Sequence, residues 1–526
     1  MNSLSKLQCN LGFQYFVSYF KKFKLKSFPN APFILLDGGL STSHNIILNM
    51  LMGLAANKEE KLNVGHLTGV HEASIINYLM EETLGSKEIN FYKYAGRKSV
   101  IWRYRIEKFK FLLYKRHQKL LEYKIEEILV GDLIYDTIIR FHNDIFTVDK
   151  IGHREKKIIY ETIHRYYVYK EILKEYNIKY IILSHKYYMY FGIMPRLILK
   201  NNGIIFSESR GHIKRLTTFD EFMKNDFVFD KTFLNEISKI DIAQIEQFID
   251  DRFNGRIDQH DVKNAYTNKV HYSREEIVAQ LKLNPALPIA TILPHAFSDA
   301  PHCHRFMIYD DYYGWFIDTL RIIEGIPNIN WLIKPHPSAA LYFEDGVVNN
   351  ILAGNSSNNI KLLPSDIHTE SVFKLSDTVV TIRGTVGLEA VLYDIKPIIS
   401  GDAVYSDLGI TTNCKTKKEY EKALNSIQFK VRLDPEDIRK AKFCLYWWHG
   451  ISLPPLGIVP NEIVPNLPEE TVLKHDMAAY EIASAFLKES GHEKDIYFIK
   501  LCEFFRRDKN RLSGLDFLKN EDNSAN

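Results

Sequence analysis

Short apolar runs alternate with stretches of helical periodicity along most of this chain. The run PFILLDGG at 32–39 predicts a short buried strand that ends in glycines, and residues 41–57 predict a helix after it. Further along, 179–186 predicts a strand, the next residues a helix stopped at Asn201-Asn202-Gly203, and 203–209 another strand. Strand, helix and strand within about thirty residues predict a βαβ crossover and therefore parallel pairing.

A second series of the same kind starts after the proline-containing junction at 284–289. Its predicted strands are 288–297, 329–337, 359–366, 377–384 and 396–402, and its predicted helices are 310–327, 370–376 and 385–395. The segments 97–175, 215–285 and 415–526 are polar or charged and predict mainly helices.

Two such series predict an α/β protein with two Rossmann-like domains facing a cleft, followed by C-terminal helices. The expected parts are a basic, aromatic segment at 1–30, an N-terminal Rossmann-like domain with helical insertions at 31–285, a C-terminal Rossmann-like domain at 286–470, and C-terminal helices at 471–526. Ligands of such sheets bind beyond the carboxyl ends of the strands, so the loops that follow the strands are the places to look for chemistry.

Composition excludes several classes of protein. The 526 residues carry 68 Lys and Arg against 65 Asp and Glu, a net charge of +3 that gives no support to a nucleic-acid-binding protein. Five cysteines without a CxxC pair argue against a disulfide framework or a zinc ribbon, and a reducing cytoplasm is the simplest location. No run approaches the ~20 apolar residues of a membrane span.

The first thirty residues mix aromatic side chains, from Phe13 to Phe20, with lysines from Lys21 to Lys26. An aromatic stripe at helical spacing is typical of a helix packed on the body of a protein, which we favour here. The alternative is a helix that lies on an anionic membrane surface, which would make the protein peripheral to the inner face of a bacterial cytoplasmic membrane.

The sequence NWLIKPHPS at 330–338 carries the first candidate chemistry. A buried strand delivers Lys334, His336 and Ser338 to its carboxyl end, and the prolines restrict the loop that holds them. A histidine in this position can donate to a phosphate oxygen or a sugar hydroxyl, but a lone loop histidine bonded to backbone is the ordinary alternative.

A second candidate is TIRGTVGLEA at 381–390, where a strand ends and a helix begins. Arg383 supplies a fixed positive charge, Gly384 lets backbone approach a ligand, and Thr385 adds a hydroxyl. Glu389 follows Thr385 by one helical turn, so it is expected on the same face, where a carboxylate suits a sugar diol. The glycine pattern is neither GxGxxG nor GxxxxGK[ST], which argues against NAD, FAD and P-loop nucleotide sites.

A third candidate is HAFSDAPHCH at 295–304, where His295, Asp299, His302 and His304 crowd the end of a strand. These side chains are good metal ligands, but Asp–His pairs also orient substrates without a metal. We expect no metal here, and no base is available to make Cys303 a nucleophile.

Together, the KPHP loop, the Gly-Thr-x-Gly-x-Glu-Ala helix, the following Lys-Pro strand and the pair Gly401 and Tyr405 resemble bacterial surface-polysaccharide glycosyltransferases of the GT-B fold. The nearest resemblance is to the capsule polysaccharide biosynthesis family, which includes Kdo transferases, and it covers about residues 288–412. The KPHP element is also similar to that of CDP-glycerol glycerophosphotransferases.

The resemblance implies that His336, Ser338 and Thr385 contact the phosphate and ribose of a donor nucleotide, with Lys334, Arg383 and Gly384 beside them and Glu389 at the ribose. Related CMP-sugar enzymes often carry two hydroxyl residues before the helix, where this chain has Gly384-Thr385. That departure favours a donor with more phosphate charge than CMP.

In GT-B enzymes the N-terminal half binds the acceptor. The resemblance therefore implies catalytic groups among Asp37 and Glu208 at strand ends, with His185 and Arg210 binding the acceptor. His295 and Asp299 are further catalytic candidates.

The sequence as a whole predicts a metal-independent glycosyltransferase with no cofactor beyond a nucleotide-sugar co-substrate. It would transfer a sugar, such as Kdo or another ulosonic acid from a CMP-sugar, onto a bacterial surface polysaccharide or lipid-linked glycan. The alternatives are a CDP-glycerol or ribitol-type polyol-phosphate transferase, a nucleotide-sugar 2-epimerase, and a catalytically silent glycan-binding scaffold.

Overall fold

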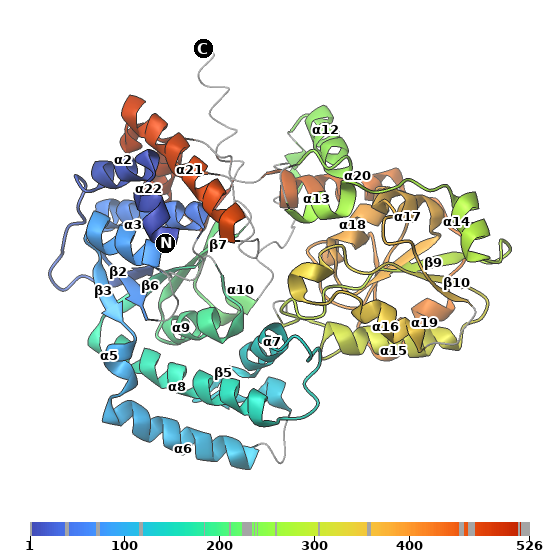
Figure 1. Ribbon diagram of the computed structural model, residues 1–526, viewed down its shortest axis with the longest axis horizontal. Helices are drawn as coiled ribbons and strands as arrows, with labels where there is room; N and C mark the ends of the chain where they lie inside the picture. Colours follow the sequence, from blue (N-terminus) through green and yellow to red (C-terminus); the bar gives the residue numbers. More distant parts are fainter. Residues whose placement is uncertain are drawn as a thin grey trace. The chain divides into compact units, whose positions relative to one another are not determined.

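The computed structural model of the chain divides into two compact units (Figure 1). Unit 1 comprises residues 1–137, 151–222 and 451–526, and unit 2 comprises residues 138–150 and 223–450. The structure describes residues 3–36, 42–69, 74–114, 119–183, 185–209, 212–223, 234–257 without 236 and 239, 260–302, 306–354, 359–451, 457–460, 469–513 and 516.

Unit 1 is built on a seven-stranded sheet in the order β15-β8-β7-β6-β1-β2-β3. Strands β7, β6, β1, β2 and β3 are parallel, whereas β8 pairs antiparallel with β7 and β15 antiparallel with β8. The strands are β1 (Phe33–Leu36), β2 (Asn63–Thr68), β3 (Lys87–Asn90), β6 (Ile178–Leu183), β7 (Ile204–Ser209), β8 (His212–Leu216) and β15 (Arg511–Ser513). The parallel part has the order of a Rossmann fold, with its switch point between β1 and β6.

Helices surround this sheet, and a small hairpin of β4 (Lys124–Ile125) and β5 (Ile128–Leu129) lies outside it. The helices are α1 (Ser3–Gln8), α2 (Leu11–Phe20), α3 (Ser43–Glu59), α4 (Ser74–Asn77), α5 (Tyr92–Ala95), α6 (Lys98–Tyr114), α7 (Gly131–Phe141), α8 (His153–Glu175), α9 (Tyr188–Lys200), α10 (Phe219–Met223), α21 (Glu469–Glu489) and α22 (Ile496–Arg506). Of these, α7 and α10 begin in unit 1 and end in residues of unit 2. The predicted crossover at 179–209 is confirmed, because α9 joins the parallel strands β6 and β7.

Helix α2 near the N-terminus and helices α21 and α22 near the C-terminus share one core within unit 1 (Figure 1). The aromatic stripe of α2 is buried, and the rings of Phe13 and Phe16 lie 4.8 and 5.2 Å from that of Tyr480 on α21. The expectation that the N-terminal aromatic segment packs on the body is therefore confirmed. The C-terminal helices do not form a separate part after the C-terminal domain, as 471–526 was predicted to do, because their apolar faces complete the core of unit 1.

Unit 2 holds a six-stranded, wholly parallel sheet in the order β11-β10-β9-β12-β13-β14. The strands are β9 (Ile289–Ile292), β10 (Asn330–Ile333), β11 (Ile360–Leu362), β12 (Thr378–Thr381), β13 (Ile398–Ile399) and β14 (Thr412–Asn413). Every residue of β9, β10 and β12 is buried, which is typical of parallel strands covered on both faces. This order is that of a complete Rossmann fold, with its switch point between β9 and β12.

The helices of unit 2 include the segment before the sheet. They are α12 (Ile242–Phe253), α13 (His260–Tyr266), α14 (Arg274–Leu281), α15 (Tyr312–Glu324), α16 (Val347–Ala353), α17 (Thr369–Leu375), α18 (Thr385–Val391), α19 (Lys417–Asn425) and α20 (Pro435–Leu445). The predicted boundary at 285 is wrong, because Phe253, Tyr266 and Ile277 pack in one core with residues of β10 and α17. Helices α12, α13 and α14 therefore belong to unit 2.

The predicted fold class, α/β with two Rossmann-like halves, is confirmed by the two strand orders. Within the described residues, no helix has both the length and the apolar character needed to cross a membrane.

Candidate functional site

The candidate groups of unit 2 lie at the switch point of its sheet. His295 follows β9, Lys334 and His336 follow β10, and Arg383 follows β12. Because β10, β9 and β12 are neighbouring parallel strands, their carboxyl ends bring these side chains, far apart in sequence, to one edge. This is the place where open α/β sheets bind ligands.

Stacked rings connect the three strand ends. The ring of His295 stacks on that of Tyr312 at 4.5 Å and on that of His336 at 5.7 Å. The Arg383 guanidinium carbon lies 5.8 Å from the centre of the Tyr312 ring. Burial lowers the pKa of His295 to about 4, and the positive charge of Arg383 acts in the same direction. His295 is therefore neutral at pH 7 and can either donate or accept a hydrogen bond.

Arg383 is a buried cation that lacks a carboxylate partner among the residues that the structure describes. Its Nη2 donates to the carbonyl oxygen of Phe306 at 3.1 Å, but Nε and Nη1 are buried without a described hydrogen-bond partner. The missing side chain of Gly401 makes room for this group, since a Cβ there would lie 3.1 Å from Nε and from Nη2. A buried guanidinium with unpaired N–H groups is a ready site for an anion.

Lys334 is a second buried cation. Its Nζ donates to Thr369 Oγ1 at 2.7 Å, and within the described ranges no carboxylate oxygen lies within ion-pair distance. Burial, with the nearby positive charge of Lys269, lowers the pKa of Lys334 to about 7. An anionic ligand would restore the charged form of this amine.

A hollow of about 270 Å³ opens beside Lys334 and His336. Its walls also include Lys269, His295 and Ser365, together with the carboxylates of Glu344 and Asp345. Arg383 is not part of these walls. Lys269 was not predicted, because a lysine in a polar helical stretch carries no signal of its own.

The loop after β9 is fixed by Glu344, another residue that the sequence patterns did not single out. This buried carboxylate accepts hydrogen bonds from the backbone N–H groups of Phe297 and Ser298, each at 2.8 Å, and from Ser298 Oγ. Burial raises its pKa. Glu344 therefore positions the His295 loop, and no spacing in the sequence links the two segments.

Two of the predicted donor-site residues, Glu389 and Ser338, form hydrogen bonds with other side chains of the protein. Glu389 is buried, with Oε1 at 2.8 Å from Arg252 Nη2 and Oε2 accepting from Tyr266 Oη at 2.7 Å. These bonds join α18 to α12 and α13 instead of presenting the carboxylate to a ribose. Ser338 is buried and its Oγ accepts from Asn264 Nδ2 at 3.4 Å, while its N–H donates to His336 Nδ1 at 3.2 Å.

The start of α18 is shaped by Tyr405. The Tyr405 hydroxyl donates to the carbonyl oxygen of Gly384, the residue that precedes the helix. The same hydroxyl occupies the space of a side chain at Gly387, where a Cβ would lie 2.4 Å from it. Thr385 follows at the first position of the helix and is half-buried. Gly384, Gly387 and Tyr405 therefore pack directly against one another.

The remaining predicted groups are placed as follows. Asp299 Oδ2 lies 3.8 Å from His295 Nδ1, which is near but beyond hydrogen-bond distance. In unit 1, Glu208 is buried on β7, and His185 follows β6 with its ring stacked on Tyr188 at 5.5 Å. Asp37 and Arg210, like Cys303 and His304, lie outside the described residues. The catalytic and acceptor-binding roles of these groups stay predictions.

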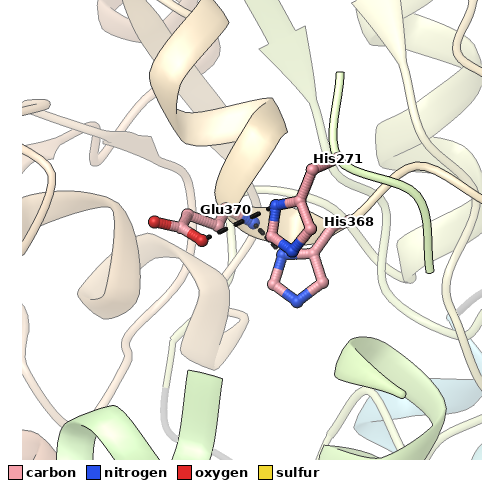
Figure 2. Close-up of side chains that lie close together, drawn as sticks. All are labelled: His271, His368 and Glu370. Atoms are coloured by element: carbon pink, nitrogen blue, oxygen red, sulfur yellow. Dashed lines mark hydrogen bonds and ion pairs between the residues drawn. The ribbon is translucent and has the colours of Figure 1, made fainter. Parts of the chain in front are cut away.

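Among the residues that the structure describes, one group of side chains has the composition of a metal site, namely His271, His368 and Glu370 (Figure 2). The two imidazole rings stack at 4.1 Å, and His271 Nδ1 lies 3.8 Å from Glu370 Oε2. However, His368 Nδ1 accepts the N–H of Glu370, where it caps α17, and the Glu370 carboxylate pairs with Lys374 at 2.7 Å. These contacts occupy His368 Nδ1 and Glu370 Oε1 within the protein and leave the other ligand atoms of the group available. The expectation of metal independence stays a prediction.

Several solved structures resemble the chain at low identity. The beta-Kdo 2,4 transferase KpsC of Thermosulfurimonas dismutans is 10% identical over 51% of this chain and 79% of that chain, with a TM-score of 0.31. The UDP-GlcNAc 2-epimerase of Methanocaldococcus jannaschii is 14% identical over 79% of this chain and 97% of that chain, with a TM-score of 0.23. A glycosyltransferase of Rickettsia africae is 11% identical over 91% and 98% of the two chains, with a TM-score of 0.23. TM-scores this low do not assign an activity.

No curated protein matches the chain. Residues 320–430, however, match the sequence family described as capsule polysaccharide biosynthesis protein. This region contains the Lys334–His336 loop, Arg383 and the helix that starts at Thr385. The resemblance to the capsule polysaccharide biosynthesis family that these motifs predict is thereby confirmed.

Proposed function

We propose that this protein is a glycosyltransferase of bacterial surface-polysaccharide synthesis, and that unit 2 binds the phosphate of a nucleotide-sugar donor at the switch point of its sheet. The observation that carries the proposal is the buried guanidinium of Arg383, whose Nε and Nη1 have no described partner. The family match over residues 320–430 supports it.

The charge of the site favours a phosphate-bearing ligand over a neutral sugar. Burying a cation without a counter-charge is costly, and both Arg383 and Lys334 are buried without a described carboxylate partner. The carboxylate that is close by, Glu344, already accepts three hydrogen bonds from the loop it holds. A phosphate oxygen would supply both the negative charge and the acceptors that the site lacks.

His295 completes the proposal. Its neutral imidazole can donate a hydrogen bond to the leaving phosphate or to a donor hydroxyl, and the Asp299 carboxylate lies 3.8 Å from its Nδ1. Two separate buried cations suit a donor with more than one phosphate charge at least as well as a CMP-sugar. The sugar itself and the acceptor glycan are not specified by these groups.

A nucleotide panel tests the proposal. We expect CMP, CDP, UDP or GDP to raise the melting temperature, because a ligand at 100 times its Kd stabilises a protein by about 2.7 kcal/mol. His336→Ala should remove this stabilisation, since His336 lines the hollow. The matched control is Arg321→Gln on α15 of the same unit, where the side chain is exposed and paired with Asp318.

The outcome also separates the alternatives. Stabilisation by CMP supports an ulosonic acid donor, stabilisation by UDP or GDP supports a hexose donor, and stabilisation by CDP points to a polyol-phosphate transferase. If no nucleotide changes the melting temperature of wild type, the donor-site proposal fails and the glycan-binding scaffold becomes the better account.

A further inference from the structure

Helix α6 (Lys98–Tyr114) carries apolar side chains on two opposite faces. It lies at the edge of unit 1 alongside α8 (Figure 1). Its inner face packs against the unit through Val100 and Phe111, which are each 1% exposed, and through the buried Glu107. A single apolar face would be enough to hold the helix in place, so the second face has no role in that packing.

The outer face forms a continuous apolar stripe. Trp102, Ile106, Phe109 and Leu113 follow one another at spacings of four, three and four, which places them in one line along a helix. Their exposed fractions are 66%, 40%, 62% and 53%. Scattered single apolar residues are normal on a protein surface, but four in line on one helix are the mark of a docking face.

Basic residues flank this stripe. At the angular positions of an α-helix, Lys98 and Arg105 lie along one side of it and Lys110 along the other, and all are exposed. The acidic residue of α6, Glu107, is buried and accepts hydrogen bonds from Tyr123 and Tyr167 at 3.2 Å. Its Oε2 also pairs with Lys110 Nζ at 3.3 Å, so the unpaired positive charge beside the stripe is that of Lys98 and Arg105. The outer face therefore combines apolar and positive groups without an exposed negative charge.

From this surface we propose that α6 lies flat on an anionic phospholipid bilayer, with Trp102, Ile106, Phe109 and Leu113 at the level of the headgroups. Helices that bind at a membrane surface typically carry Trp, Phe and aliphatic side chains on one face, with basic residues beside them. The positive flanks favour an anionic lipid surface over a second copy of this chain, which would bring the same positive charge to the contact. The inference does not depend on the proposed donor site.

Trp102 provides a direct readout. Three of the other tryptophans, Trp315, Trp331 and Trp447, are fully buried, and Trp448 is half-buried, so a change at the surface is reported mainly by Trp102. We expect vesicles of equal parts phosphatidylglycerol and phosphatidylcholine to shift its emission to shorter wavelength and to co-sediment with the protein. Vesicles of phosphatidylcholine alone should bind at least tenfold more weakly, because each basic residue near an anionic surface contributes about a fivefold factor.

Two sets of substitutions test the face itself. The double variant Phe109→Ser/Leu113→Ser should lower partitioning onto the anionic vesicles by at least tenfold, and Trp102 still reports its binding. The double variant Arg105→Glu/Lys110→Glu should lower partitioning by the same factor and should abolish the dependence of vesicle binding on salt concentration. The matched control is Phe429→Ser with Val431→Ser, which removes exposed apolar side chains from unit 2. All of these positions are exposed, so the melting temperatures of the variants should stay close to that of wild type.

The proposal is overturned if wild type does not bind the anionic vesicles. It is equally overturned if the α6 variants bind these vesicles as tightly as wild type and the Phe429/Val431 control do. It is also overturned if sedimentation shows a dimer that the Phe109/Leu113 substitutions dissociate while vesicle binding is absent, because the face would then contact a second copy. Vesicle binding is measured without a nucleotide sugar. A failure of the membrane proposal can therefore be told apart from a failure of the donor-site proposal.

Discussion

At the scale of single residues, unit 2 holds two buried basic side chains, Arg383 and Lys334, that have no carboxylate partner within the described part of the chain. Arg383 was predicted as a fixed charge and Lys334 as a group at a strand end, and both lie at the switch point. Their burial is a property of the folded chain, because it depends on Tyr312, Phe306 and Thr369, which no local spacing connects to them.

Arg383→Met should raise the free energy of unfolding of the ligand-free protein by about 1–3 kcal/mol, because it removes a buried group with unpaired N–H donors. Arg252→Met is the matched comparison, since Arg252 is equally buried but paired with Glu389, and it should lower the same quantity by about 3–5 kcal/mol. Urea unfolding of both variants measures the difference. If Arg383→Met and Arg252→Met lowered the free energy of unfolding equally, the charge of Arg383 would have to be paired with a negative group of the protein.

Lys334 predicts how nucleotide binding depends on pH. Its pKa of about 7 means that the free protein loses this charge as pH rises above 7, whereas a bound phosphate holds the proton. Affinity should therefore fall as pH rises from 7 to 9, by up to about tenfold per unit, and binding should take up a proton. Nucleotide phosphates are already fully ionised in this range, since their second pKa is about 6.

The pH dependence is measured by calorimetric titration in buffers of different ionisation enthalpy. Lys334→Met should remove the slope, and Lys374→Met, at an exposed lysine of the same unit paired with Glu370, should keep it. A slope that survives in the Lys334 variant would assign the titrating group elsewhere.

At the scale of elements, the strands with continuous apolar runs were predictable and those with polar residues were not. The predicted runs contain β1, β7, β9, β10, β11, β12 and β13, and all of β6 except its first residue, Ile178, because a buried parallel strand leaves such a signature. Strand β2 reads NVGHLT and β3 reads KEIN, which carry no such signal, and both were missed. Strand β8 was missed because it follows β7 closely and its sequence HIKRL is largely polar.

Helix α18 shows the limit of spacing arguments. One helical turn separates Thr385 from Glu389, and this predicted a shared ligand-facing side. In the structure, Glu389 bonds to Arg252 and Tyr266, partners more than 120 positions earlier in the chain. Burial of that carboxylate is decided by α12 and α13, whose packing on unit 2 could not be inferred from the local pattern.

The same helix gives a prediction about the motif glycines. Gly387→Ala should lower the free energy of unfolding by about 1–3 kcal/mol, because its Cβ would lie 2.4 Å from the Tyr405 hydroxyl. Tyr405→Phe removes that hydroxyl, so the double variant should be more stable than Gly387→Ala alone. Urea unfolding of the four proteins gives the coupling, and strictly additive effects would show that the contact is not the cause.

At the scale of the whole molecule, the chain builds two Rossmann-like units and returns to the first one at its end. The repeated strand and helix pattern predicted both units, because that pattern is local. The return of α21 and α22 to unit 1 is a long-range event, in which Ser43 near the N-terminus donates its N–H to Asp476 at 2.9 Å. Periodicity showed that these residues are helical but not which core they complete.

The close approach of α2 and α21 can be tested at Gly12. A Cβ there would lie 2.7 Å from the Cα of Glu481, so Gly12→Val should separate the two helices and lower the free energy of unfolding by about 1–3 kcal/mol. Hydrogen exchange should quicken in 11–20 and in 469–489 together. Gly96→Ala is the control, because its Cβ would meet no atom within 4 Å, and it should leave exchange in both helices unchanged.

The central claim is that unit 2 binds the phosphate of a donor nucleotide through Arg383 and Lys334. Its most direct test is calorimetric titration of wild type and Arg383→Met with the nucleotide that stabilises the protein best, and with the corresponding uncharged nucleoside. The account predicts that the nucleotide binds wild type, that the nucleoside binds at least a hundredfold more weakly, and that Arg383→Met binds both equally poorly. Equal affinity of wild type for nucleoside and nucleotide, or undiminished nucleotide binding by Arg383→Met, would contradict it.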